Sequence, residues 1–272
     1  MTAFATPVKP SRRLAIADSP HSHGNFSYLA MGDPAKAAVV LIHGFGADLL
    51  TWQLCLVPLS QHYRVIAIDL PGHGRTSVDV GTADLPFMTA WLSETLDRLG
   101  LPHAHLVGHS MGAKIAIGFA LALPHRVTSL SLISPAGLGG EFHHATLDTF
   151  LDTPSTNNAA AMAAHLLGPK GANLIPGLTA SLLNAAADDD RNAALKKLLG
   201  HAKTYGLALS PEGFDWSRLR MPVKLMWGDH DRLIPMPHAH HLPPVQVITG
   251  AGHLPHMEAS SVVVSALKEF LP

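Results

Sequence analysis

Short apolar runs alternate with longer helical patterns along most of this chain. The runs are rich in Val, Ile and Leu, as is typical of strands that are buried on both faces of a sheet. They predict strands near residues 14–17, 26–30, 37–42, 65–68, 104–107, 129–133, 223–227 and 245–248. The stretches between them predict helices near 51–61, 86–100, 111–123, 236–241 and 257–270. This alternation predicts an α/β fold with a mostly parallel central sheet flanked by helices.

The strand pattern stops at about residue 138 and resumes at Val223. The intervening stretch is Ala-rich, and its helical spacing predicts helices near 144–152, 157–167, 176–186 and 190–203. We therefore expect an N-terminal extension at 1–25, an α/β core at 26–138 and 211–272, and a helical cap at 139–210.

The place of this insertion predicts a lid. It follows a central strand, so it lies at the carboxyl edge of the sheet, where parallel sheets bind their ligands. A lid at that edge excludes water and shapes the pocket beneath it. Within the insertion, Phe142, Met162 and Leu166 are candidates to face this pocket.

Composition narrows the function classes. The chain has 272 residues, 47% of them hydrophobic, which is enough for one large core. Its net charge of −1 gives no electrostatic reason to expect nucleic-acid binding. No apolar run reaches membrane-spanning length, and Arg12-Arg13 is not followed by the apolar segment of an export signal. Because Cys55 is the only cysteine, we expect no internal disulfide and a cytoplasmic protein.

The 19 histidines raise the question of a metal site. The candidate groups are His143-His144 and the cluster formed by His238, His240 and His241. Adjacent histidines in a helix or strand diverge, and no cysteine or acidic cluster nearby completes a tetrahedral set. We expect surface histidines here, and neither a metal nor an organic cofactor.

Residues Gly108-His109-Ser110-Met111-Gly112 match the nucleophile elbow G-x-S-x-G. They join a predicted strand directly to a predicted helix, and so sharp a turn leaves room only for glycine on either side of Ser110. The turn exposes the Ser110 hydroxyl at the carboxyl end of the sheet, beside the N–H groups of the helix N-terminus. A serine that merely caps the helix is the alternative explanation.

Two backbone N–H groups are candidates for an oxyanion hole. The glycine-rich turn His43-Gly44-Phe45-Gly46 follows a central strand and precedes the elbow in the chain. The N–H of Phe45 in this turn and the N–H of Met111, the residue after Ser110, would both point at a developing oxyanion. A simple strand-exit turn is the alternative for the first of them.

Two late loops supply a candidate acid and base. Asp231 lies further into the loop after the strand at 223–227 than Asp229, which suits a turn-forming role. His253 stands on a Gly-rich loop, 22 residues after Asp231, and its imidazole would accept the hydroxyl proton. His256 is the competing base, but its place at the start of a helix indicates capping or packing.

The order Ser110, Asp231, His253 is that of the α/β-hydrolases. His109 and Leu254 adjoin two of these residues, and we expect them to contribute to the substrate pocket. The loop from Asp69 to Ser77 is turn-rich, and we expect Asp69 and His73 to brace its neighbours rather than to act in catalysis.

Taken together, these motifs resemble the α/β-hydrolase fold family over nearly the whole chain. The segments 40–48, 69–74, 133–139 and 251–259 are most similar to the catalytic domain of acetoin dehydrogenase acetyltransferase (E2) subunits. Members of that family carry a lipoyl domain ahead of the hydrolase domain, and the first 25 residues here are too few for one. Dehalogenases and epoxide hydrolases of the same fold use an aspartate where Ser110 stands.

We therefore expect a serine hydrolase that acts on a small ester or thioester through an acyl-enzyme on Ser110. Three alternatives stay open: acyl transfer to a thiol acceptor, hydrolysis of a carbon–carbon bond, and a ligand-binding protein of the same fold without turnover. The expected partner is a small acyl substrate.

Overall fold

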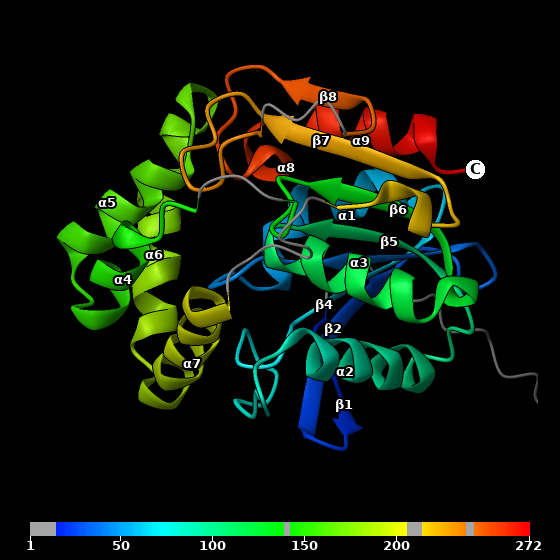
Figure 1. Ribbon diagram of the computed structural model, residues 1–272, viewed down its shortest axis with the longest axis horizontal. Coiled ribbons are helices and arrows are strands. Elements are labelled where there is room, and N and C mark those ends of the chain that lie inside the picture. Colours follow the sequence, from blue (N-terminus) through cyan, green and yellow to red (C-terminus); the bar gives the residue numbers. More distant parts are fainter. Residues whose placement is uncertain (1–14, 139–141, 206–213, 238–241) are drawn as a thin grey trace, which may run out of the picture.

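The computed structural model describes residues 15–138, 142–205, 214–237 and 242–272. Within these ranges the chain forms a twisted sheet flanked by helices (Figure 1). The strands are β1 (Ala17–His21), β2 (Gly24–Met31), β3 (Ala38–Ile42), β4 (Arg64–Ile68), β5 (Ala104–His109), β6 (Val127–Ile133), β7 (Val223–Gly228) and β8 (Val245–Ile248). They lie in the order β1-β2-β4-β3-β5-β6-β7-β8.

All pairings from β4 across to β8 are parallel, whereas β1 pairs antiparallel with β2 and β2 with β4. The prediction of a mostly parallel α/β sheet is confirmed. Parallel strands place their carboxyl ends at one edge, so the loops that follow β3, β5, β7 and β8 meet there.

In the described part of the chain two large hydrophobic clusters form the core, one on each face of the sheet, and Ile248, Ala251 and Ala259 form a small third one. Val39 and Leu41 of β3 belong to one cluster, while Val40 and Ile42 belong to the other, because successive side chains of a strand point to opposite faces. Helices α1 and α9 complete the first cluster, and α2 and α3 belong to the second. These helices are α1 (Gln53–Ser60), α2 (Leu85–Arg98), α3 (Met111–Ala122) and α9 (Ser260–Phe270).

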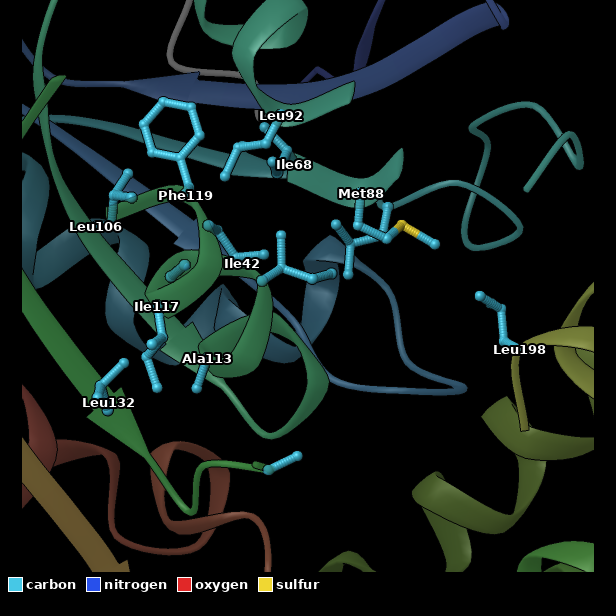
Figure 2. Close-up of a cluster of buried hydrophobic side chains, with 14 of the residues drawn as sticks. Ile42, Ile68, Met88, Leu92, Leu106, Ala113, Ile117, Phe119, Leu132 and Leu198 are labelled. Atoms are coloured by element: carbon cyan, nitrogen blue, oxygen red, sulfur yellow. The ribbon is translucent and has the colours of Figure 1, made fainter. Parts of the chain in front are cut away.

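Helix α3 is buried against the sheet along most of its length. Figure 2 shows Ala113, Ile117 and Phe119 of this helix close to Ile42 and Leu106 of the strands. Phe119 is fully buried, as expected for a helix that is apolar all round. This packing fixes the position of the first turn of α3, where the elbow lies.

Helices α4 (Ala145–Asp152), α5 (Thr156–Leu166), α6 (Ile175–Ala186) and α7 (Asp189–Tyr205) confirm the four helices predicted in the insertion. In Figure 1 they group on the side toward which the arrowheads of β7 and β8 point. The carboxylate of Asp188 accepts a hydrogen bond of 3.0 Å from the N–H of Arg191, so the acidic run caps α7.

The N-terminal prediction is wrong in its placement. The strand expected at 14–17 lies at Ala17–His21, with residue 14 outside the described part, and it forms a hairpin with β2. The two-residue turn between His21 and Gly24 sets this register and adds both strands to the sheet edge. The sheet therefore begins at Ala17, and an N-terminal extension that reaches residue 25 is too long.

Two helix predictions also need correction. Met236 lies between Pro235 and Pro237 and is not helical, because a residue that precedes proline is disfavoured in the helical region; residues 238–241, with His238, His240 and His241, lie outside the described part. The helix expected at 257–270 is two helices, α8 (Pro255–Glu258) and α9, separated at Ala259.

Candidate active site

Ser110 directly follows β5 and has a backbone conformation that L residues rarely adopt. Its φ is 52° and its ψ is −116°, and α3 begins at the next residue. The N–H of Ser110 donates to the carbonyl of Ile133 at 3.0 Å, and its own carbonyl accepts from the N–H groups of Ala113 and Ala136 at 3.1 Å each. These bonds hold the strained residue in place, in the manner of a nucleophile elbow.

The glycines beside Ser110 are required by the close approach of α3 to the strands. A Cβ atom at Gly108 would lie 2.5 Å from the Cα of Ala113. One at Gly112 would lie 2.4 Å from the carbonyl oxygens of Ile42 and His43. Side chains at either position would push the helix away from the sheet, which explains the spacing of the motif.

The turn after β3 runs directly past the serine. A Cβ atom at Gly44 would lie 3.0 Å from the Cβ of Ser110. The N–H of Gly46 donates to Nε2 of His73 at 2.9 Å, and Nδ1 of His73 then donates to the carbonyl of Pro71 at 2.8 Å. Burial lowers the pKa of His73 to about 3, so this ring is neutral. His73 braces the turn, as its sequence context predicted.

The candidate oxyanion donors are Phe45 and Met111. Phe45 lies in the braced turn, and Met111 is the first residue of α3. No acceptor among the described residues takes either N–H in the turn and loop hydrogen bonds. An oxyanion hole requires N–H groups that are free in this way, and the part of these two residues in catalysis stays a prediction.

Asp231 and His253 form a buried hydrogen-bonded pair, and they lie in the loops that follow β7 and β8. Nδ1 of His253 donates to Oδ2 of Asp231 at 2.7 Å, and the two residues are 2% and 6% exposed, respectively. The other oxygen, Oδ1 of Asp231, accepts from the N–H groups of Leu233 and Ile234 at 3.0 and 2.9 Å. With Nδ1 as the donor, Nε2 is the basic nitrogen of the neutral ring.

Asp229 has different partners. Its carboxylate accepts a hydrogen bond from the N–H of Gly250 at 2.7 Å and lies 2.8 Å from Nδ1 of His230. It therefore joins the turn after β7 to the turn after β8, a loop-bracing role that agrees with the turn-forming role suggested by its sequence position.

His109 connects the serine to the histidine loop. Its Nε2 donates to the carbonyl of His253 at 2.7 Å, and the two ring centroids are 4.9 Å apart. Burial holds the pKa of His109 well below its usual range, so the ring donates as a neutral group. Because His109 precedes Ser110, this bond brings the elbow and the His253 loop together at the carboxyl edge of the sheet.

His256 packs beneath this pair. It is fully buried in α8, with ring centroids 4.4 Å from Trp52 and 4.5 Å from His109. Neither ring nitrogen has a hydrogen-bond partner, and burial lowers its pKa to about 3. His256 is thus a packing residue and not a second base.

The pocket candidates lie close to the second cluster of the core. Met162, Leu166 and Leu254 are buried within it, and Phe142 is half-buried against it. Their contact with a substrate stays a prediction. Sequence reasoning missed Glu258, whose carboxylate accepts from the N–H groups of residues on both sides of His253; its only signal was an acid shortly after that histidine.

Two features are absent from the described part of the chain. It contains no group of three or more His, Cys, Asp or Glu residues that could hold a metal ion. None of its helices combines the length and apolar character needed to cross a membrane.

Comparison with known proteins gives the same architecture. Residues 37–260 match the family described as alpha/beta hydrolase fold. The chain is 33% identical, over 90% of its length, to the dihydrolipoyllysine-residue acetyltransferase component of the acetoin cleaving system of Cupriavidus necator, and it covers 66% of that protein. A Burkholderia vietnamiensis protein named 2-hydroxy-6-oxononadienedioate/2-hydroxy-6-oxononatrienedioate hydrolase is 32% identical over 73% of the chain, which covers 72% of it.

Solved structures share this fold. The 2-hydroxy-6-oxo-6-phenylhexa-2,4-dienoate hydrolase of Rhodococcus sp. strain RHA1 superposes with a TM-score of 0.81 at 21% identity, covering 95% of this chain and 99% of that one. The carboxylesterase CesB of Bacillus subtilis gives 0.74 at 21% identity, covering 96% and 92%. At such identities the likeness concerns the fold alone.

Gly112→Ala should destabilise the protein by about 1–3 kcal/mol or more, because the added methyl would contact two carbonyl oxygens of the neighbouring backbone. The matched control is Gly177→Ala in α6, where no atom lies within 4 Å of the new Cβ and a gain of about 0.4–1 kcal/mol is expected. Urea unfolding measures both. Equal stabilities of the two variants would contradict the close approach at the elbow.

His256→Phe should weaken the dependence of stability on pH. The native ring resists protonation down to a pKa of about 3, whereas the unfolded histidine takes up a proton near 6.5, so the wild type loses stability as the pH falls below that value. Each pH unit removes about 1.4 kcal/mol per such group. Between pH 6.5 and about 5 the variant should lose about 2 kcal/mol less than the wild type. Identical losses in urea unfolding would refute the neutral buried ring.

Proposed function

The chain belongs to the alpha/beta hydrolase fold family, and we propose that it is a serine hydrolase that acts on a small ester or thioester. The observation that carries the proposal is the buried pair of Asp231 and His253, joined through His109 to the strained Ser110. A backbone strain of this kind persists only where the surrounding structure enforces it, and it often marks a reactive residue.

In this proposal Nε2 of His253 removes the proton from the Ser110 hydroxyl as its oxygen attacks the carbonyl carbon of the substrate. The oxyanion receives hydrogen bonds from the N–H groups of Phe45 and Met111. His253 then gives the proton to the departing alkoxide or thiolate, which leaves an acyl group on Ser110. Water, deprotonated by the same imidazole, releases the acid and restores the serine.

Asp231 has two tasks in this sequence. Its hydrogen bond to Nδ1 fixes the tautomer in which Nε2 is free to accept a proton, and its charge stabilises the imidazolium that forms. The two backbone N–H donors on its other oxygen keep the carboxylate oriented toward Nδ1 of His253.

We assign the cap role to residues 139–210, over an α/β core that is formed by the sheet and helices before and after them. The described helices of this stretch lie at the carboxyl edge of the sheet, where a lid would exclude water from the acyl-enzyme (Figure 1). Phe142, Met162 and Leu166 from the cap, and His109 and Leu254 from the core, would line the pocket for the acyl group.

A second candidate is transfer of the acyl group to a thiol. It is favoured by the 33% identity, over 90% of this chain, to an acetyltransferase component. The acyl-enzyme would be the same, with a thiolate in place of water as the second nucleophile. The chain spans only 66% of that relative's length, so the relative's full activity is not carried over.

Ser110→Ala should lower the hydrolysis of p-nitrophenyl acetate by at least about 10³-fold, because the nucleophile is lost. Covalent labelling by a fluorophosphonate probe should disappear as well. The matched control, Ser261→Ala, removes an exposed hydroxyl on α9 and should behave like the wild type in both assays. Turnover or labelling of Ser110→Ala at the wild-type rate would show that the assignment is wrong.

The two candidates differ in their product. With acetyl-coenzyme A as the donor and dihydrolipoamide as the acceptor, a hydrolase should accumulate free acetate at a rate that the acceptor does not change. Accumulation of acetyl-dihydrolipoamide in place of acetate, absent with Ser110→Ala, would favour transfer and overturn simple hydrolysis.

A further inference from the structure

Glu258, at the end of α8, is a half-buried carboxylate with no task in the proposed reaction. Its Oε1 accepts hydrogen bonds from the N–H of Gly252 at 2.9 Å and from the N–H of Leu254 at 3.3 Å. Its Oε2 accepts from the N–H of Gly168 at 2.7 Å. One side chain thus binds the residues on both sides of His253 and a residue that follows α5.

The segment after α5 and the His253 loop touch backbone to backbone. The N–H of His253 itself donates to the carbonyl of Leu166 at 2.7 Å. A Cβ atom at Gly168 would lie 2.6 Å from the nitrogen of Gly252, and one at Gly252 would lie 2.5 Å from the nitrogen of Gly168. Side chains are excluded at this contact, so the N–H groups there depend on an acceptor that reaches in from elsewhere. Glu258 is that acceptor.

The loop that carries Asp231 is hydrogen-bonded to the same end of α5. The guanidinium of Arg232 donates to the carbonyl of Leu167 at 2.7 Å and also binds the carbonyl of Ala164. The last carbonyls of a helix have no partners within it, and a cation is favoured there. Both members of the buried pair are therefore attached, through their own loops, to one end of α5.

These contacts provide hydrogen-bond partners for the polar groups of His253 and of the residues beside it. Its N–H is bound by Leu166, its carbonyl by His109, and its Nδ1 by Asp231. Glu258 binds the N–H groups on either side. Only Nε2, the nitrogen that would accept the serine proton, is left without a hydrogen bond in this set.

We propose that Glu258 is a positioning residue. It holds the His253 loop against the end of α5, so that Nε2 of His253 is positioned to accept the proton of the Ser110 hydroxyl. This inference rests on the proposed function. It also implies that the end of α5 does not swing away when substrate enters, since the imidazole would move with it.

A role in positioning can be separated from a role in folding. Burial raises the pKa of Glu258, so its ionised form does not by itself favour the native state. Replacement by glutamine keeps the shape and one acceptor oxygen, but sets an amide NH₂ against an N–H donor. Replacement by aspartate keeps the charge, but is one methylene too short to reach Gly168 and Gly252 together.

The experiment compares wild type, Glu258→Gln, Glu258→Asp and the matched control Glu269→Gln, which removes an exposed charge on α9. The readouts are the rate and end point of fluorophosphonate labelling, kcat and KM for p-nitrophenyl acetate, and the thermal midpoint. In both Glu258 variants we expect complete labelling at the end point, with the labelling rate and kcat about 10- to 100-fold lower, because a small displacement of a reacting group has effects of this size. KM should stay close to wild type, the thermal midpoint should fall by no more than a few degrees because some N–H groups lose their acceptor, and the control should match the wild type throughout.

Wild-type labelling rates in either soluble Glu258 variant would overturn the assignment. A loss of rate that only mirrors a smaller labelled fraction would also overturn it, since that is what a purely structural residue gives. If glutamine prevents folding, the aspartate variant decides by the same criteria. A wild type that neither labels nor hydrolyses the ester would refute the proposed function, and the positioning role with it.

Discussion

The left-handed backbone of Ser110 is the constraint on which this structure depends. A strand can pass into a helix within one residue only if that residue takes a positive φ, here 52°. The turn then brings the first turn of α3 to the carbonyls of Ile42 and His43, where only glycine fits. The hydrophobic core holds this arrangement in place, because most of α3 is buried against the sheet (Figure 2). Strain at one residue is thus balanced by the packing of a whole helix.

Around the elbow, buried histidines act as neutral hydrogen-bonding and packing groups. Burial lowers the pKa of His73, His109 and His256, so none of them adds a positive charge beside His253. His73 accepts from Gly46, and His109 donates to the carbonyl of His253. An additional cation at either place would oppose formation of the imidazolium. These three histidines therefore surround His253 as uncharged groups.

The last turn of α5 connects the helical insertion to the two loops that carry Asp231 and His253. Arg232 binds its carbonyls, and the N–H of His253 binds the carbonyl of Leu166. The insertion is consequently bonded to both loops, next to Asp231 on one side and at His253 itself on the other. Movements that admit a substrate are then expected elsewhere in the cap.

The sequence by itself determined the α/β class, most strands and the four helices of the insertion, because apolar period and chain length are local properties. It also identified the elbow, since the glycine requirement is written into five consecutive residues. It misplaced β1, whose position depends on pairing with β2, and it predicted a helix at Met236 where flanking prolines forbid one. Only the tertiary structure decided that Asp231, and not Asp229, meets His253, and that Glu258 and the end of α5 bind the His253 loop. Those relations join residues up to 90 positions apart, and no local pattern records which loops a folded sheet brings to the same edge.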